Sequence, residues 1–244
     1  RSIKHIYMDD KILSPANINP YLISGGSCIV KKEAKSISKL PDMVRGNMPY
    51  DGGNLILSVE EKNQLANHYP LADSLLKVLI GSEEFINGNK RYCLWIDDNK
   101  LDFALNIPEI AIRIEKTKQM RLSSPDEGAR KLAQRSHQFR EFISPSDSSI
   151  IIPIHSSENR EYIPIGFLII DYVLTNAAMA IYDADMWLFG VVTSKIHMIW
   201  IRTVCGALET RIRYSSTLGY NTFPFPEISE EKKKEIEEAA EEVL

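Results

Sequence analysis

Two short stretches of the sequence combine residue types and spacings that could do chemistry. Residues 45–53 read RGNMPYDGG, in which the tetrapeptide from Asn47 to Tyr50 differs at one position from the Asn-Pro-Pro-Tyr that holds a flipped base in amino-methyltransferases of DNA. Residues 208–214 read LETRIRY. Arginine can bind the edge of guanine through two hydrogen bonds, and glutamate can accept one from the amino group of cytosine. The first stretch would act on a base, and the second would read bases.

The catalytic interpretation of Asn47 lacks its structural context. In amino-methyltransferases the tetrapeptide ends a buried strand of a doubly wound sheet, and a separate glycine-rich turn binds the cofactor. Residues 38–46 read SKLPDMVRG and contain no apolar run that could form such a strand. The chain also contains no Gly-x-Gly turn. We therefore expect the match to the tetrapeptide to be accidental.

Other catalytic patterns are incomplete. A loose Pro-Asp and Glu-x-Lys pattern over residues 41–62 resembles the metal site of endonucleases, but residues 60–62 fall in the first turn of a predicted helix, where the helix dipole explains acidic side chains. There is no Gly-x-Ser-x-Gly or phosphate-binding loop, and neither the three cysteines nor the five histidines have metal-ligand spacing. We expect no catalytic site and no metal site in this chain.

Residues 113–140 form a basic stretch, with eight Arg or Lys against three acidic residues. The last 18 residues carry a net charge of −5, so the remaining 226 carry +1, although the whole chain is at −4. Basic stretches bind phosphate backbones, but a solvated helix face has the same composition. The candidate phosphate ligands here are Arg113, Lys116, Lys118, Arg121, Arg130, Lys131 and Arg135.

Alternation in residues 208–214 predicts one strand with two different faces. One face would carry Leu208, Thr210, Ile212 and Tyr214, and the other Glu209, Arg211 and Arg213. Three charged side chains side by side suit base readout in a major groove. They suit a lattice of cross-strand salt bridges on a wet sheet face equally well.

The elements that must position these residues are of mixed type. Strands and helices follow one another without a regular βαβ repeat, which predicts an α+β fold, a mixed sheet with flanking helices. The predicted helices are one capped by Ser58 with Glu61, one over 71–80, one that begins at Ser124 and Pro125, a buried one from 186 to about 204 and an acidic one from 229. The predicted strands cover 91–96, 149–155 and 163–170, with 178–184 ambiguous.

Size and composition limit the class of protein. The chain of 244 residues is 44% hydrophobic, enough for a real core, and is long for one domain but short for two. Its apolar runs are too short or too interrupted to span a bilayer, so no membrane contact is expected. Three widely spaced cysteines fit a reducing cytoplasm.

Four long blocks of the sequence carry a family likeness. Residues 46–58, 80–96, 150–168 and 188–226 resemble, in order, the target-recognition region of MmeI-like enzymes. These are single-chain restriction and modification proteins of Type IIG or IIL. They join an adenine-specific DNA methyltransferase, often with a nuclease, to a DNA-reading domain and a helical C-terminal part.

The resemblance implies a division of labour along the chain. Residues 1–226 would form the target recognition domain, and 227–244 the start of the helical region. Base readout would fall to Glu209, Arg211 and Arg213, with Arg202, Asn176 and Ala177 as neighbouring contacts. The loop over 47–53 would contact the DNA backbone through Asn47, Tyr50, Gly52 and Gly53.

The resemblance also implies partners and cofactors. The partners would be double-stranded DNA and the methyltransferase domain of the same polypeptide. S-adenosylmethionine, and Mg²⁺ if a nuclease is present, would bind in other domains, and this part of the protein would hold no cofactor. Two alternatives stay open from the residues alone: a stand-alone hydrolase or methyltransferase with a dispersed site, and a scaffold whose basic face docks an acidic protein.

Overall fold

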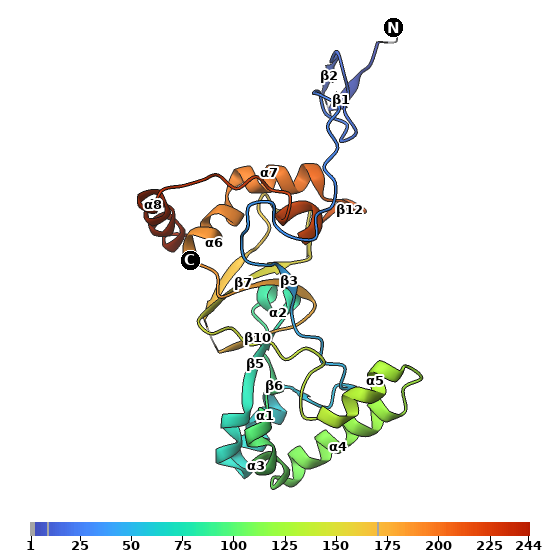
Figure 1. The fold of residues 1–244 in the computed structure, drawn as a ribbon, viewed down its shortest axis with the longest axis vertical. Helices are drawn as coiled ribbons and strands as arrows, with labels where there is room; N and C mark the ends of the chain where they lie inside the picture. Colours follow the sequence, from blue (N-terminus) through green and yellow to red (C-terminus); the bar gives the residue numbers. More distant parts are fainter. Residues whose placement is uncertain (1–2, 9, 170) are drawn as a thin grey trace.

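The computed structural model describes residues 3–8, 10–169 and 171–244, apart from the side chain of Leu208. Along its longest axis the molecule has two bodies, each with its own sheet and helices, and an N-terminal hairpin that projects from one end (Figure 1). The hairpin consists of β1 (Ile6–Met8) and β2 (Lys11–Leu13). Mixed helices and sheets confirm the predicted α+β class.

The first body contains the sheet β10-β5-β6-β4, in which only the β10–β5 pair is parallel. Its core joins leucines of the strands to Ile110 and Ile114 of the longest helix. The strands are β4 (Ile56–Leu57), β5 (Leu76–Ile80), β6 (Arg91–Leu94) and β10 (Tyr172–Leu174). The helices are α1 (Val59–His68), α3 (Leu101–Leu105), α4 (Pro108–Leu122) and α5 (Glu127–Lys131), with 3₁₀ turns at Pro70–Leu75, Asp98–Lys100 and Leu132–Arg135.

The second body contains the antiparallel sheet β3-β11-β7-β9. The helices α6 and α7 cover one face of this sheet, and α2 lies against the other (Figure 1). The strands are β3 (Val44–Arg45), β7 (Ser148–Pro153), β9 (Gly166–Ile169) and β11 (Ala178–Tyr182). The helices are α2 (Ser82–Asn87), α6 (Met186–Thr193), α7 (Lys195–Val204) and α8 (Glu230–Glu241).

The strand β7 connects the two bodies because its side chains alternate between faces. Ile150 and Ile152 enter the core under α6 and α7, whereas Ile151 packs on the opposite face with Ile80 and Leu174 of the first sheet. Both faces of β7 are therefore buried, which explains the run of apolar residues in this strand.

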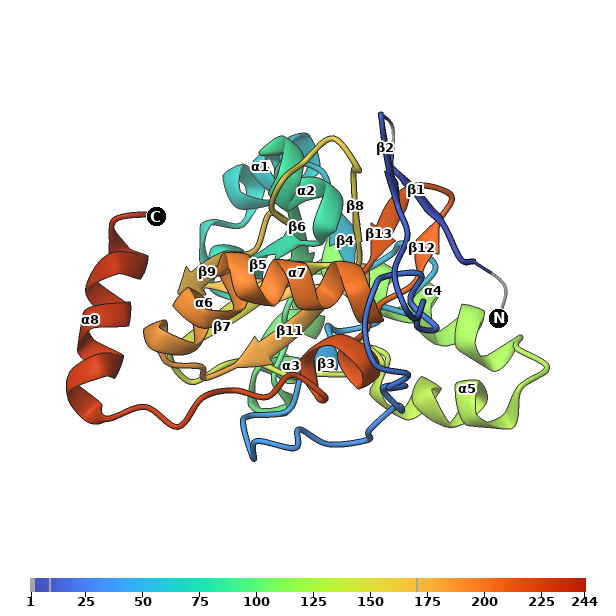
Figure 2. The ribbon, with the colours of Figure 1, turned by 90° about the horizontal axis from the view of Figure 1, so that it is seen from above.

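A third, small sheet of order β12-β13-β8 borders the second body. It is built from β12 (Ala207–Leu208), β13 (Arg211–Arg213) and β8 (His155–Ser156), and a single π-helical turn at Ser216–Tyr220 follows β13. Seen from above, this sheet and α8 lie on opposite sides of the α6–α7 layer (Figure 2). Gly190 of α6 allows α8 to approach closely, since a Cβ at that position would lie 2.6 Å from Ile236.

Of the predicted helices, two begin where expected, one is wrong in type and one is interrupted. The capping box of Ser58 and Glu61 is present, and Ser229 caps α8. Residues 71–80 are instead a 3₁₀ turn followed by β5, which takes a central place between β10 and β6. The predicted helix over 186–204 is interrupted because Ser194 has extended backbone angles and caps α7 with its side chain.

The helix predicted from Ser124 begins later than expected. Asp126 is its cap, because the carboxylate accepts a hydrogen bond of 2.7 Å from the N–H of Ala129. The α-helical part, α5, then covers only five residues. His137, beyond the end of α5, is buried, and its Nε2 lies 2.8 Å from a carboxylate oxygen of Asp98.

Candidate nucleic-acid interface

The strand β13 presents arginines on its outer face. Arg211 and Arg213 are exposed, and Ile212 and Tyr214 between and after them are buried at 9% and 3% exposure. This is the alternation that residues 211–214 predicted. The two guanidinium groups therefore project from the same side of the strand.

The inner face of β13 is anchored in the core. The hydroxyl of Tyr214 lies 2.8 Å from Nε2 of His197, which is fully buried on α7. The backbone N–H of Tyr214 donates to the carbonyl of Ile154 at 2.8 Å. Burial lowers the pKa of His197 to about 3, so this histidine is neutral at ordinary pH. The arginines of β13 thus extend from a strand whose back is fixed by a buried polar contact.

Glu209 does not lie on the strand face, as the single-strand prediction had it. It occupies the tip of the β12–β13 hairpin with a left-handed φ of 59°. Its carboxylate accepts a hydrogen bond of 2.9 Å from Arg211, and both side chains are exposed. An exposed ion pair of this kind contributes little to stability, so either partner can exchange it for another polar group.

Two cations and a histidine that the sequence analysis did not single out lie near Arg213. The register of the small sheet pairs Arg213 with His155, and Arg45 and Lys32 line one groove together with Arg213. Partial burial lowers the pKa of His155, and the positive charges of Arg213, Arg211 and Arg45 lower it further. His155 and Arg45 are far from Arg213 in sequence, so only the topology brings them together.

We call Arg45, His155, Arg211 and Arg213 the arginine row. Among the residues that the structure describes, no carboxylate lies within 4 Å of the guanidinium groups of Arg45 or Arg213. Arg45 and Arg213 therefore have no carboxylate counter-ion among these residues, and such cations create a positive potential that attracts phosphates.

Asn176 and Ala177 lie in the turn between β10 and β11. The N–H of Asn176 donates to the carbonyl of Asn47 at 3.0 Å, and Ala177 is exposed. Because Arg45 precedes Asn47 by two residues, this turn lies beside the Arg45 end of the row. The structure thus places Glu209, Arg211 and Arg213 together on one hairpin, and Asn176 and Ala177 at a separate turn near Asn47.

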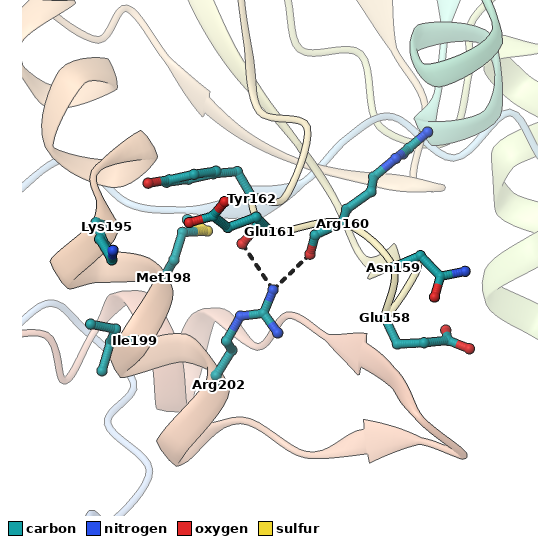
Figure 3. Close-up of a pocket in the computed structure, with 9 residues that line it drawn as sticks. All are labelled: Glu158, Asn159, Arg160, Glu161, Tyr162, Lys195, Met198, Ile199 and Arg202. Carbon is teal, nitrogen blue, oxygen red and sulfur yellow. Dashed lines mark hydrogen bonds between the residues drawn. The ribbon is translucent and has the colours of Figure 1, made fainter.

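Arg202 is the sixth predicted base contact, and the structure gives it a different neighbourhood. It extends from α7 toward the loop that follows β8, where Nη2 donates to the carbonyls of Arg160 and Glu161 at 2.7 and 2.8 Å (Figure 3). Its guanidinium therefore binds protein backbone at this position.

The prediction that Asn47 contacts the DNA backbone is wrong. Asn47 is fully buried. Its Nδ2 donates to the carbonyls of Ile143 and Leu174 at 2.9 and 3.2 Å, and its Oδ1 accepts from the N–H of Ile143 at 2.7 Å. The side chain joins three segments of the chain and cannot reach a phosphate.

The rest of the loop over residues 48–53 is folded tightly on the first body. Tyr50 has a left-handed φ of 44°, and its hydroxyl lies 3.2 Å from that of Ser124. Asp51 is buried and accepts from the N–H groups of Gly53 and Leu55 at 3.0 and 2.6 Å. Gly52 and Gly53 are exposed with left-handed φ angles of 65° and 80°. A backbone contact to DNA from these glycines and Tyr50 stays a prediction.

The prediction for Arg121 is also wrong. Its side chain is fully buried, and all five of its N–H donors are used on backbone carbonyls of this chain. The distances range from 2.7 to 3.3 Å, and the acceptors are the carbonyls of Pro49, Tyr50, Leu132, Arg135 and Gln138. Arg121 therefore fixes the 48–53 loop to the segment after α5 and has no donor left for a phosphate.

Two further arginines of the basic stretch are half-buried and bound internally. Arg113 pairs with the Glu61 carboxylate at 2.5 Å and donates to the carbonyl of Asn54 at 3.0 Å. Arg135 donates to the carbonyl of Phe139 at 3.1 Å. These contacts leave only part of each guanidinium facing solvent.

The remaining predicted phosphate ligands are exposed. Lys116 and Lys118 lie on the outer face of α4, and Lys118 is 4.0 Å from Glu115. Arg130 donates to the carbonyl of Pro125 at 2.7 Å. Lys131 pairs with Glu127 at 2.8 Å on the surface. These four cations could meet a phosphate backbone without a change in the fold.

The comparison with protein families decides the relationship. Residues 24–227 match the family described as MmeI, target recognition domain. The chain belongs to this family. The resemblance predicted from the four sequence blocks is therefore confirmed.

Two relatives of this MmeI-type domain are much longer than the chain. It is 43% identical over 241 residues to DNA methyltransferase A of Bacillus subtilis (strain 168), a match that covers 99% of the chain and 27% of the relative. It is 40% identical, with a TM-score of 0.84, to a structure of the Type IIL restriction-modification enzyme MmeI in complex with DNA, over 94% of this chain and 31% of that one. The chain thus spans about a third or less of each relative.

Two observations on the described residues concern cofactors and membranes. They contain no group of three or more His, Cys, Asp or Glu side chains arranged to hold a metal ion. Their helices are also all too short or too polar to cross a bilayer.

Proposed function

We propose that this MmeI-type domain recognises a specific sequence in double-stranded DNA for a restriction-modification methyltransferase of the same polypeptide. The observation that carries the proposal is the arginine row, in which Arg211 and Arg213 face solvent from a strand that is fixed in the core. Nucleic-acid recognition needs such a combination, because base contacts are specific only if the side chains start from a rigid position.

Within this proposal the groups of the row divide the work. Arg211 and Arg213 contact base edges, with Glu209 as an acceptor and Asn176 and Ala177 at the adjoining turn. Arg45 and Lys32 neutralise phosphates beside them. The exposed cations of the other body, Lys116, Lys118, Arg130 and Lys131, supply contacts that do not depend on sequence.

The proposal extends to the rest of the polypeptide. Residues 1–226 would be the recognition domain, and α8 would begin the helical region. Methylation at adenine N6, with S-adenosylmethionine and any Mg²⁺ bound in other domains, follows from the family likeness of the sequence blocks. The greater length of both relatives supports a partner domain on the same chain. We also propose that the protein acts in the cytoplasm.

The test uses the full-length protein expressed in cells, with its modified bases mapped by sequencing. Arg211→Ala and Arg213→Ala should each relax the preference at one base pair by about 1–3 kcal/mol. Lys131→Ala, which removes an exposed cation paired with Glu127, is the control and should leave the modified sequence unchanged. An unaltered modified sequence in both arginine variants would overturn the proposal.

A further inference from the structure

The loop that follows β8, residues 157–162, is held firmly although it lies on the surface. The N–H of Arg160 donates to the carbonyl of Ser157 at 3.2 Å, which closes a turn. Arg202 then binds the carbonyls of Arg160 and Glu161 from the side of α7 (Figure 3). Beyond the loop, Ile163 is buried, at 4% exposure. Both ends and the middle of the loop are thus fixed.

The side chains at the tip of this loop are those that can read base edges. Glu158, Asn159 and Arg160 are all exposed. Figure 3 shows that the side chain of Arg160 points away from Arg202. Arginine matches guanine, asparagine matches adenine and glutamate matches cytosine in the major groove.

The loop adjoins the β12–β13 hairpin. It leaves β8, the strand that pairs with β13, so the start of the loop lies beside the hairpin. The pKa of Glu158 is lowered by its own backbone N–H first, then by the Thr210 side chain and by the charge of Arg211. Glu158 is therefore an ionised side chain on the part of the loop that adjoins the hairpin.

We propose that residues 158–160 form a second reading element, which contacts a base pair next to the one read by Arg211, and that Arg202 is the positioning residue that holds it. This inference rests on the proposed function. A loop whose backbone is already ordered loses less conformational freedom when it binds, so its side chains can discriminate between bases. It also explains why Arg202 uses its two hydrogen bonds on the loop backbone.

The test maps the modified bases of the full-length protein in cells for Asn159→Ala, Arg160→Ala and Arg202→Ala. We expect Asn159→Ala or Arg160→Ala to reduce discrimination about 5- to 150-fold at one base pair, different from the pair that responds to Arg211→Ala. Arg202→Ala should relax the same pair as the loop variants. The double variant of Arg202 and Arg160 should be no worse than the stronger single variant, because both act through one contact.

Glu161→Ala is the matched control, since it removes a side chain of the same loop and keeps the carbonyl that Arg202 binds. It should leave the modified sequence unchanged. If Arg211→Ala alters the sequence and neither loop-tip variant does, the second reading element is wrong and the proposed function stands. If none of the variants alters it, the proposed function itself fails.

The role of Arg202 is tested separately from that of the loop tip. A purely structural role would lower modification equally at all sites and lower the melting temperature, and that result would overturn its assignment as a positioning residue. Arg202→Gln, which retains an N–H donor, should recover part of the lost discrimination. Should Arg202→Ala fail to fold, the two loop-tip variants and Arg202→Gln decide the matter, because each keeps the core intact.

Discussion

Arginine has opposite roles in the two bodies of this molecule. In the first body, Arg121 is buried with five backbone acceptors, and Arg113 is tied to a carboxylate and backbone carbonyls. In the second body, Arg211 and Arg213 extend into solvent from a strand with a buried back. The stretch of the sequence with the most positive charge thus uses some of its arginines for contacts within the protein. The number of charges in a stretch therefore predicts attraction to phosphate only if the fold leaves the charged groups exposed.

Histidine shows the same division. His197 is buried and neutral, with its hydrogen bond to Tyr214, whereas His155 is exposed in the arginine row. Burial is the first cause of the lowered pKa in both, and only His155 also responds to neighbouring positive charges. The core of the second body therefore holds a neutral polar pair directly behind a cationic surface.

The strongest way to break this comparison is Arg121→Ala. The change leaves five buried carbonyls without donors, so we expect the free energy of unfolding to fall by about 3–5 kcal/mol. Denaturant unfolding measures the loss. Lys116→Ala, on the outer face of the same helix, should change stability by less than about 0.5 kcal/mol. Equal stability of the two variants would mean that Arg121 is not structural.

A second comparison sets Asn47 against Asn176. Asn47→Ala removes three hydrogen bonds of a fully buried side chain to Ile143 and Leu174, and we expect a loss of about 2–3 kcal/mol in unfolding free energy. Asn176→Ala should cost less than about 0.5 kcal/mol, because that side chain is half-buried at a turn. A thermal-unfolding series on both variants is sufficient, and the reverse order of losses would contradict the assignment.

The pH dependence of stability tests the neutral state of His197. Its pKa in the folded protein, about 3, is below the ordinary value of 6.5, so the unfolded chain takes up the proton first as pH falls. Its contribution is complete above about pH 6.5 and is lost as the pH falls toward 3. Between pH 7 and 5, the native protein should lose about 2 kcal/mol more than His197→Gln. Parallel stability curves for the two proteins would show that this histidine is not held neutral.

The smallest expected effect concerns the exposed cations of the first body. Lys118→Ala should weaken binding of the full-length protein to all DNA sequences alike and reduce the slope of log affinity against log salt by about 0.9. The modified sequence should not change. Titrations of DNA binding at several salt concentrations give the slope. A loss of affinity for one DNA sequence alone would mean that Lys118 reads a base. The two bodies would then not differ in the kind of DNA contact they make.

The sequence could predict the alternation on β13 because a strand with one buried face has a period of two. It could not predict the row as a whole, since His155 joins Arg213 through strand pairing and Arg45 lines one groove with Arg213 from a strand of another sheet. The likeness of four long sequence blocks predicted the target-recognition family, and this prediction did not depend on the strand pairings.

The inward position of Arg121 did have a local signal. Ile110, Ile114, Thr117 and Arg121 are spaced four, three and four residues apart, which is one face of a helix, and all four are buried in α4. A count of charges over residues 113–140 does not distinguish this buried face from the exposed one. Helical periodicity counted from the preceding isoleucines would have excluded Arg121 as a phosphate ligand.

The short connection between β10 and β11 has a mechanical consequence. β10 ends at Leu174 in the sheet of one body and β11 begins at Ala178 in the sheet of the other, so only three residues couple them. The N–H of Asn176 and the side chain of Asn47 brace this coupling. A twist of one body against the other therefore acts directly on Asn176 and Ala177, because three residues leave little length to absorb it.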